Sequence, residues 1–357
     1  MNFIGIDLHK KTISVCVVNQ ERKVLRRKSL DCVEPDKIVS FFEECGAFAA
    51  VVEATASYEW LWRLLEPLAQ RLVLAHPKKL RVIAESKNKS DRLDAQVLAE
   101  FLALGMIPEA YRPTLRQRQH RTLVRQRCFV QKNLTRVRNK IRRVLSDYNA
   151  DRRDLFTAAG LKYLKEITKK VSEADRFVLN QLLTEWQYHR QQFQAVSRQL
   201  KAFAQKASAK EQEIRTVLGS MPAVGPTTIE VVLSEIGDIE RFRSQKRVVA
   251  YAGLAPGHRE SAGHKKDLGI TKQGSGLLRW VLIQTAWRTV RCSLRWRSVY
   301  ENLKKRRGSK RAIVAVARRL LTVMAALWRT GQLYRRAEEG SGQAVLPTHK
   351  ATVAAPA

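Results

Sequence analysis

The 357-residue sequence predicts an α/β domain, then a long basic helical segment, then a second, mainly helical domain. Three observations support this division. Residues 1–110 alternate short apolar strands with amphipathic helices. Residues 111–215 include a stretch, 115–145, with no Gly or Pro, and residues 216–336 contain further helices separated by Pro and Gly. Residues 337–357 are small and polar with little periodicity, so we expect them to be disordered.

The charge of the chain predicts a polyanionic partner. Lysines and arginines number 66 against 33 aspartates and glutamates, giving a net charge of +33 at pH 7. Such an excess destabilises a compact chain unless a polyanion balances it, so we expect nucleic acid. A basic protein of the membrane surface is the alternative, but we find no lipidation motif, no signal peptide and no uninterrupted apolar run of membrane length.

The cysteines and the missing membrane signals together predict a cytoplasmic protein. The sequence has five cysteines, with no CxxC spacing and no Cys/His cluster. This pattern favours a reducing compartment and argues against a zinc site or a disulfide framework. We therefore expect no membrane partner.

The first 110 residues predict a mixed sheet covered by helices. Residues 2–8, 12–19 and 23–30 are predicted to form three consecutive strands. A helix over 35–45, a strand over 47–53, a helix over 57–70, a strand over 71–75 and a helix over 77–86 follow. This order is typical of the ribonuclease-H-like architecture, in which helices lie on the faces of a mixed sheet.

Four carboxylates in this region form a candidate metal site. Asp7 lies inside the first apolar strand, where an unpaired charge is costly, and Glu53 ends another apolar strand. If these strands are neighbours, both carboxylates emerge at one edge of the sheet. Asp91 and Asp94 are three residues apart at the start of a further helix, with Ser90 as its predicted N-cap, so they share a helix face.

Carboxylate oxygens are the ligands that Mg²⁺ and Mn²⁺ prefer, and two such ions can assist phosphoryl transfer. The sequence therefore predicts that Asp7, Glu53, Asp91 and Asp94 bind Mg²⁺, with Mn²⁺ as the alternative ion. The simpler interpretation is that each of these side chains caps a strand or a helix.

Residues 111–215 predict a basic helical arm. The helix over 115–145 has an apolar stripe, and no acidic residue occurs in it. A helix face with charges of one sign is a good surface for phosphates, although a merely solvated face is the alternative. A second helix over 175–206 is predicted to pair with the first as an antiparallel, coiled-coil-like arm. The cations predicted to contact nucleic acid here are Arg125, Arg136, Arg138, Lys140, Arg142 and Arg143.

Residues 216–336 predict a second compact domain with two candidate sites. A helix, a Pro-x-x-Gly loop ending at Gly225 and a helix over 228–236 are similar to a helix-hairpin-helix, which binds a phosphate through backbone N–H groups. Ser261 lies in a predicted loop together with Arg259, Lys265 and Lys266. A serine that attacks a phosphodiester needs a base and cations nearby, although a loop serine is more often a turn residue.

Several motifs resemble one family of recombinases. The segments GIDLHK (5–10), EATASY (53–58) and KSDRLDA (89–95) resemble the DEDD transposases of the IS-one-ten group, which are relatives of the Piv invertase. YAGLAP (251–256), Ser261 and TKQG (271–274) resemble the C-terminal transposase domain of that group. One departure is Ala56, where the family usually has Gly.

The resemblance implies a RuvC-like DEDD catalytic domain (1–110), a coiled-coil arm (111–215) and a helical transposase domain (216–336). It implies that the four carboxylates bind Mg²⁺ and that Ser261 is the nucleophile joined covalently to DNA. It also implies a structured bridge RNA that pairs with donor and target double-stranded DNA, and a homo-oligomer between a dimer and a tetramer.

The sequence and the resemblance together predict a bridge-RNA-guided DNA recombinase of a mobile element. The first alternative is a junction-resolving nuclease that uses only the four carboxylates and water. The second is a basic RNA-binding protein without enzymatic activity.

Overall fold

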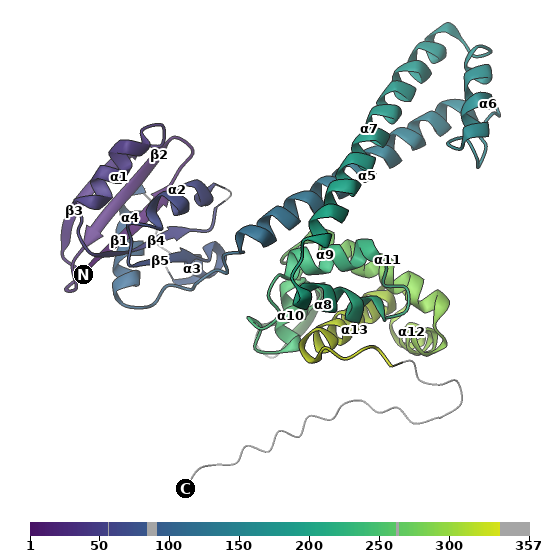
Figure 1. Ribbon diagram of the computed structural model, residues 1–357. Helices are drawn as coiled ribbons and strands as arrows, with labels where there is room; N and C mark the ends of the chain where they lie inside the picture. The colour runs from purple at the N-terminus through teal and green to yellow at the C-terminus, as the bar shows by residue number, and fades with distance from the viewer. Residues whose placement is uncertain (56, 84–90, 262–263, 336–357) are drawn as a thin grey trace. The chain divides into compact units, whose positions relative to one another are not determined.

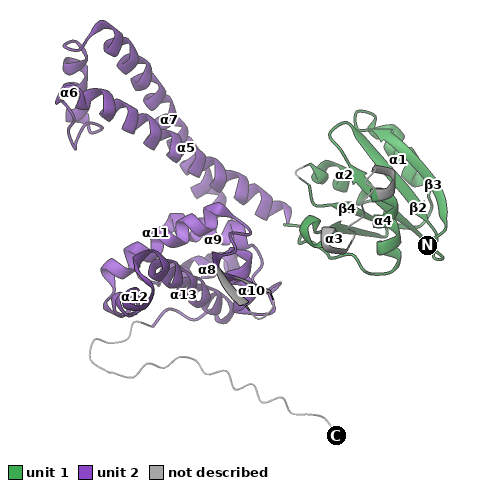
Figure 2. Cartoon of the chain, turned by 180° about the vertical axis from the view of Figure 1, so that it is seen from behind, with its two compact units in different colours: residues 1–113 green, residues 114–357 purple. Residues whose placement is uncertain are grey.

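The computed structural model describes the backbone of residues 1–55, 57–83, 91–261 and 264–335, and their side chains except at 81–83, 91–93 and 258–267. The chain divides into two compact units, Met1–Pro113 and Thr114–Ala357, coloured separately in Figure 2. The predicted helical arm and the predicted C-terminal domain belong to the same unit. The predicted disordered tail and the predicted N-cap Ser90 lie outside the described residues.

The predicted mixed sheet is confirmed in the first unit. Its strands are β1 (Asn2–Leu8), β2 (Thr12–Val18), β3 (Val24–Asp31), β4 (Phe48–Glu53) and β5 (Arg71–Ala75), in the spatial order β3-β2-β1-β4-β5. The strands β1, β2 and β3 are antiparallel neighbours, whereas β4 runs parallel to β1 and β5 parallel to β4. The strand β1 therefore lies at the centre of the sheet.

Helices cover both faces of this sheet (Figure 1). The helices α1 (Pro35–Glu43) and α2 (Tyr58–Leu65) pack on one face, and α4 (Asp91–Ala103) packs on the other; α3 (Pro77–Ile83) follows β5. The helix α2 is shorter than the predicted 57–70. The reason is Pro67, which has no backbone N–H and cannot continue the helical hydrogen bonds.

Two long antiparallel helices lead the second unit (Figure 1). They are α5 (Leu115–Ser146) and α7 (Glu173–Gln205), and the shorter α6 (Ala158–Thr168) lies between them in the chain. Contacts join the first half of α5 to late α7 and the residues just after α5 to early α7: Arg127 Nε lies 3.2 Å from Ser197 Oγ, and Tyr148 Oη lies 2.5 Å from Asp175 Oδ2. The two long helices are thus present, and supercoiling of the pair stays a prediction.

The rest of the second unit is helical apart from one hairpin. Its helices are α8 (Ala209–Gly219), α9 (Pro226–Ile236), α10 (Gln245–Tyr251), α11 (Gly276–Cys292), α12 (Leu294–Arg307) and α13 (Ser309–Thr330). Their apolar side chains form one core with the N-terminal half of α5. No helix in the described part of the chain is both long and apolar enough to cross a membrane.

The predicted loop around Ser261 was wrong, because the segment forms the antiparallel hairpin of β6 (Pro256–Ser261) and β7 (His264–Ile270). Pro and Gly suggested a loop, yet Pro256 is the first residue of its strand, where proline is tolerated. The helix α12 was not predicted, since its buried residues are only Trp296 and Tyr300 and its periodicity is weak.

Candidate functional site

Two of the predicted carboxylates lie on neighbouring strands at the same edge of the sheet. In the parallel register Ile6 pairs with Val52, so Asp7 and Glu53 are the next residues along β1 and β4. Side chains alternate between the faces of a sheet, and those of Ala49 and Val51 pack against α4. Glu53, two residues beyond Val51, therefore belongs to the face that α4 covers.

The strand β1 approaches α4 very closely at Gly5. A Cβ atom at this position would lie 1.9 Å from the carbonyl oxygen of Ala95 and 2.5 Å from the backbone nitrogen of Ala99. No side chain fits in that space, so only glycine allows the contact. Asp7 lies two residues beyond Gly5 in β1, and residues two apart point to the same face of a sheet, so Asp7 also belongs to the face that α4 covers.

The direction of α4 brings its N-terminus toward Asp7. Phe3, near the start of β1, belongs to clusters that extend to Leu102 and Ala103, whereas the atoms nearest to a Cβ on Gly5 come from the earlier residues Ala95, Leu98 and Ala99. Moving forward along β1 thus means moving backward along α4. The first turn of α4, which contains Asp91 and Asp94, is therefore at the edge where β1 ends. The side chain of Asp94 is exposed, and that of Asp91 lies outside the described side chains.

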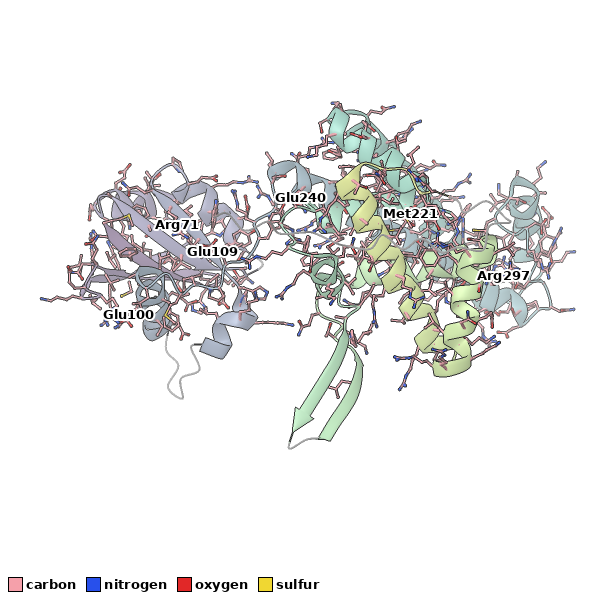
Figure 3. The ribbon with its side chains drawn as sticks, turned by 90° about the horizontal axis from the view of Figure 1, so that it is seen from below. Arg71, Glu100, Glu109, Met221, Glu240 and Arg297 are labelled. Carbon is pink, nitrogen blue, oxygen red and sulfur yellow. The ribbon has the colours of Figure 1, made fainter. Side chains whose placement is uncertain are left out.

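Hydrogen bonds fasten α4 to the sheet. Arg27 on β3 donates to the side-chain oxygen of Gln96, and Gln96 Nε2 donates to Glu100 Oε1 at 2.7 Å. Figure 3 labels Glu100 on this helix. The bond from Arg27 joins α4 to β3, and the bond from Gln96 to Glu100, within α4, holds the Gln96 side chain in place.

The metal site itself is only partly described. Among the described side chains, no group of three or more His, Cys, Asp or Glu is placed to hold a metal ion. Asp7 is 16% exposed, and its Oδ2 lies 3.0 Å from Nε2 of His9. Asp7 and Glu53 supply oxygen donors of the kind that Mg²⁺ prefers. A site that includes all four carboxylates stays a prediction, because the position of the Asp91 side chain decides it.

Ser261 is the last residue of β6 and pairs in register with His264 at the end of the hairpin. Figure 3 shows the hairpin projecting from the helices of the second unit. The side chains of Ser261, Arg259, Lys265 and Lys266 lie outside the described ones, so their predicted roles are not tested. The register does place Arg259 opposite Lys266, which brings two cationic residues to neighbouring positions.

Arg125, predicted to contact nucleic acid, has a partner inside the second unit. Its Nε and Nη2 donate to the two carboxylate oxygens of Glu235 at 2.9 and 3.1 Å. Glu235 is 2% exposed, so this ion pair neutralises a buried charge. The hydrogen bond with Glu235 raises the pKa of Arg125. This geometry gives Arg125 a structural role.

The other predicted cations of α5 lie in its C-terminal half. Arg136 Nη2 lies 3.3 Å from Glu185, and Arg143 Nη2 lies 3.6 Å from Asp147, yet their side chains are 62% and 78% exposed. Lys140 is exposed as well. Exposed ion pairs of this kind are weak, so Arg136 and Arg143 can exchange their carboxylate partners for phosphates. Lys140 is accessible to a phosphate as well.

Arg138 and Arg142 are half-buried. Their guanidinium carbons lie 5.1 and 5.9 Å from the ring centre of Phe156, and Arg142 Nη1 lies 3.3 Å from Asp151. These contacts hold the loop between α5 and α6 against α5. Both side chains thus support the fold of this region, and less of each guanidinium is available to a ligand.

A network of buried charges joins the start of α5 to α8 and α9. His120 Nε2 lies 2.5 Å from Glu230, and Arg215 Nε lies 2.9 Å from the other oxygen of Glu230. Glu211 receives hydrogen bonds from Arg116 and Arg215. Burial alone would raise the pKa of Glu230, but hydrogen bonds from His120 and Arg215 outweigh it and lower that pKa.

The acidic partners in this network are what sequence reasoning missed. The helix α5 contains no acidic residue, so the sequence predicted a surface that carries only positive charges. Its N-terminal half is instead partly neutralised by Glu211, Glu230 and Glu235, which come from α8 and α9. Only their placement next to α5 shows the pairing, so no signal in the sequence would have found it.

Gly225 is the N-cap residue of α9, and Pro226 is the first residue of that helix. The carbonyl oxygen of Gly225 already accepts hydrogen bonds from the N–H groups of Thr228 and Ile229 at 2.9 and 3.1 Å. Beside this turn lies a mostly apolar pocket of about 370 Å³ between α5, α7 and α9, and Arg127 of α5 is one of the residues that line it. The predicted phosphate contact at Gly225 is not tested.

Comparisons with known proteins give one consistent result. Residues 4–150 match the sequence model of the DEDD transposases of the IS110 group, described as "Transposase", and residues 215–301 match that of the "Transposase IS116/IS110/IS902 family". Together the two matches cover more than half of the chain.

Two transposases and a gene-inverting protein are among the relatives that match almost the whole chain. A transposase for insertion sequence element IS1111A of Coxiella burnetii is 27% identical, over 94% of this chain and 92% of its own. A probable family 20 transposase of Pseudomonas aeruginosa is 24% identical, over 93% and 98%. The pilin gene-inverting protein of Moraxella bovis is 23% identical, over 92% and 95%.

Proposed function

Because the chain belongs to the IS110 family of DEDD transposases, and is thus an enzyme that cuts and rejoins DNA, we propose a specific way in which it does so. The protein is a recombinase of a mobile element, and a structured RNA guides it to donor and target double-stranded DNA. Asp7, Glu53, Asp91 and Asp94 hold Mg²⁺, and Ser261 is the nucleophile.

One observation carries the carboxylate part of this proposal. Asp7 and Glu53 lie at the ends of adjacent parallel strands on the face that α4 covers, and the close contact at Gly5 brings the start of α4 toward the same edge. This arrangement supports a metal site to which three segments far apart in the sequence contribute carboxylates. A divalent ion held there would lower the negative charge of a bound phosphodiester. The carboxylates orient the ion, and nearby cations of the chain hold the DNA backbone.

The serine part rests on the chemistry of strand exchange. The Ser261 hydroxyl loses its proton to a base and its oxygen forms a bond to phosphorus. The bond from phosphorus to the leaving sugar oxygen breaks, and that oxygen takes up a proton. The phosphoserine ester conserves the energy of the broken bond, so a DNA hydroxyl can reverse the attack and rejoin a strand. Water as the nucleophile would leave a nick that cannot be rejoined in this way.

The carboxylate site is tested by substitutions that remove charge and keep shape. Asp7→Asn, Glu53→Gln, Asp91→Asn and Asp94→Asn should each abolish strand cleavage. Binding to DNA should persist, because its affinity comes mainly from cations. Gel-based cleavage and a binding titration on the same duplex separate the two effects. Full cleavage by Asp91→Asn in Mg²⁺ would refute the site.

The nucleophile is tested by trapping the covalent intermediate. Wild-type protein, stopped with denaturant on a DNA nicked to block rejoining, should carry DNA on the tryptic peptide that contains Ser261, and Ser261→Ala should carry none. Ser275, also beside a glycine, is the control. Its hydroxyl oxygen accepts from the backbone N–H of Leu278 at 3.2 Å and caps α11. Ser275→Asp keeps a cap and should form the adduct normally.

The same experiment separates the alternatives. Cleavage by Ser261→Ala without any adduct would favour the hydrolytic nuclease, and binding without cleavage in wild type would favour a basic RNA-binding protein. The guide RNA is tested by measuring recombination with and without the RNA transcribed from the flanks of the element. The oligomeric state is measured by light scattering of the complex with DNA, for which we propose a dimer or tetramer.

A further inference from the structure

The C-terminal helices carry a strongly basic surface outside the sites described above. Between Asp267 and Glu338 the sequence contains one acidic residue, Glu301. The end of α12 and the start of α13 concentrate the cations of this region around Gly308, and all of their side chains are exposed. We call this set the α12–α13 surface: Lys304, Lys305, Arg306, Arg307, Lys310 and Arg311.

Little inside the protein neutralises this surface. Lys304 Nζ lies 3.4 Å from Glu301, a pair in which both side chains are 48% exposed. Within the described part of the chain, the other five cations have no ion pair or side-chain hydrogen bond. The charges therefore repel one another with water as their main partner, which destabilises the compact state unless an external anion is present.

The helix dipoles explain the cations at the end of α12 but not those at the start of α13. Cations in the last turn of α12 interact favourably with the negative end of its dipole. Lys310 and Arg311 lie in the first turn of α13, at the positive end of a 22-residue helix whose first turn has no acid. Cations at that end cost stability, so their presence calls for a reason other than the fold.

Arg318, about two turns further along α13, adds another positive charge near this surface. Its Nε is buried without a hydrogen-bond partner among the described residues. Burial, and then the charges of Arg307 and Arg319, lower the pKa of this guanidinium. Positive charge is thus crowded here from two helices, which fits a surface made for a polyanion.

From these observations we infer that the α12–α13 surface binds the phosphate backbone of double-stranded DNA. This inference rests on the proposed function only in taking DNA as the substrate. Lys304 Nζ lies 5.8 Å from the ring centre of Tyr300, but Tyr300 and Trp296 of α12 are each only 5% exposed and present no ring for stacking. Single-stranded nucleic acid is held largely by stacking on aromatic side chains, so this surface fits a duplex backbone better. It would position DNA without reading its sequence.

The test is the salt dependence of binding by the full-length protein to a labelled 30-base-pair duplex of arbitrary sequence, without guide RNA. The test variant combines Lys305→Ala, Arg306→Ala, Lys310→Ala and Arg311→Ala. Each lost phosphate contact should reduce the slope of log K against log salt by about 0.9, so the full effect is about 3 to 4. We expect Kd to rise at least about tenfold at 0.1 M salt.

A control variant with the same loss of charge separates a local site from net charge. It combines alanine substitutions of four exposed lysines from α6 and the chain around the long helices: Lys162, Lys165, Lys170 and Lys206. This variant should keep Kd within about twofold and keep the slope. Equal losses in both variants would overturn the inference, as would an unchanged slope in the test variant.

Two further measurements complete the test. Thermal unfolding of the double variant Lys310→Gln/Arg311→Gln should occur at the wild-type temperature or higher, because these cations oppose the dipole of α13. A lower unfolding temperature would mean that they stabilise the fold. The second measurement is the affinity for an RNA hairpin. If the four-alanine variant binds RNA more weakly and DNA as tightly as wild type, the surface is an RNA site and the inference is wrong. Cleavage is not measured here, so failure of the catalytic proposal would not affect the result.

Discussion

The substitution Gly5→Ala tests whether the contact between β1 and α4 positions the carboxylates. The added Cβ would lie 1.9 Å from the carbonyl oxygen of Ala95, whereas ordinary contacts of this kind begin at 3.4 Å. The helix must therefore move by about 1.5 Å, because its backbone cannot rotate away as a side chain would. A displacement of about 1 Å in a catalytic group can cost about 10²-fold in rate. We expect at least that loss of strand cleavage.

The assay compares cleavage, folding and the need for metal in one preparation. Overpacking of this kind costs about 1–3 kcal/mol of stability, so the domain should remain folded at 25 °C. Cleavage of a duplex is measured across a range of Mg²⁺ concentrations, together with circular dichroism and DNA binding. If α4 carries part of the metal site, Gly5→Ala should need more Mg²⁺ for half-maximal cleavage, and DNA binding should be unchanged.

A matched control separates position from stability. Ile38 lies on α1 against the opposite face of the sheet and is fully buried, so Ile38→Val costs about 1 kcal/mol and leaves α4 untouched. That variant should cleave at the wild-type rate with the wild-type Mg²⁺ dependence. Wild-type cleavage by folded Gly5→Ala protein would refute the reasoning, since the position of α4 would then be irrelevant to catalysis.

Three further predictions concern the second unit. Arg125→Ala should lower the free energy of unfolding by about 2 kcal/mol, because it leaves the buried carboxylate of Glu235 unpaired. The salt slope of DNA binding should stay within error, and a shallower slope would show that Arg125 also contacts DNA. The pKa of Glu230 is lowered from 4.5, so its ion pairs stabilise the protein above that pH and are lost as the pH falls through the folded-state value. Glu230→Gln should therefore reduce stability by about 3 kcal/mol at pH 7 and flatten the loss of stability that begins as the pH falls below about 4.5, measured by urea unfolding. Replacing the exposed arm cations Arg136, Lys140 and Arg143 together by neutral residues should reduce the salt slope of RNA or DNA binding by about 0.7–0.9 per lost phosphate contact. An unchanged slope would show that this helix face contacts only solvent.

Local signals in the sequence determined much of the secondary structure and the sheet. The strands β1 and β5 have the predicted bounds, because apolar periodicity and flanking turn residues act over a few positions. The order of strands and helices also predicted the mixed sheet, since short connections leave few topologies open. The adjacency of Asp7 and Glu53 at one sheet edge followed from that topology.

Tertiary structure alone decided which charges are available and how closely the helix covers the site. The glutamates that pair with cations in the first half of α5 come from α8 and α9, about a hundred residues away in the chain. A helix that contains only cations in the sequence therefore has several of them in ion pairs in the fold. The contact at Gly5 likewise depends on where α4 crosses β1. Periodicity describes one element at a time, whereas ion pairs and close backbone contacts depend on the packing of two elements, and the sequence by itself does not encode that distance in any local pattern.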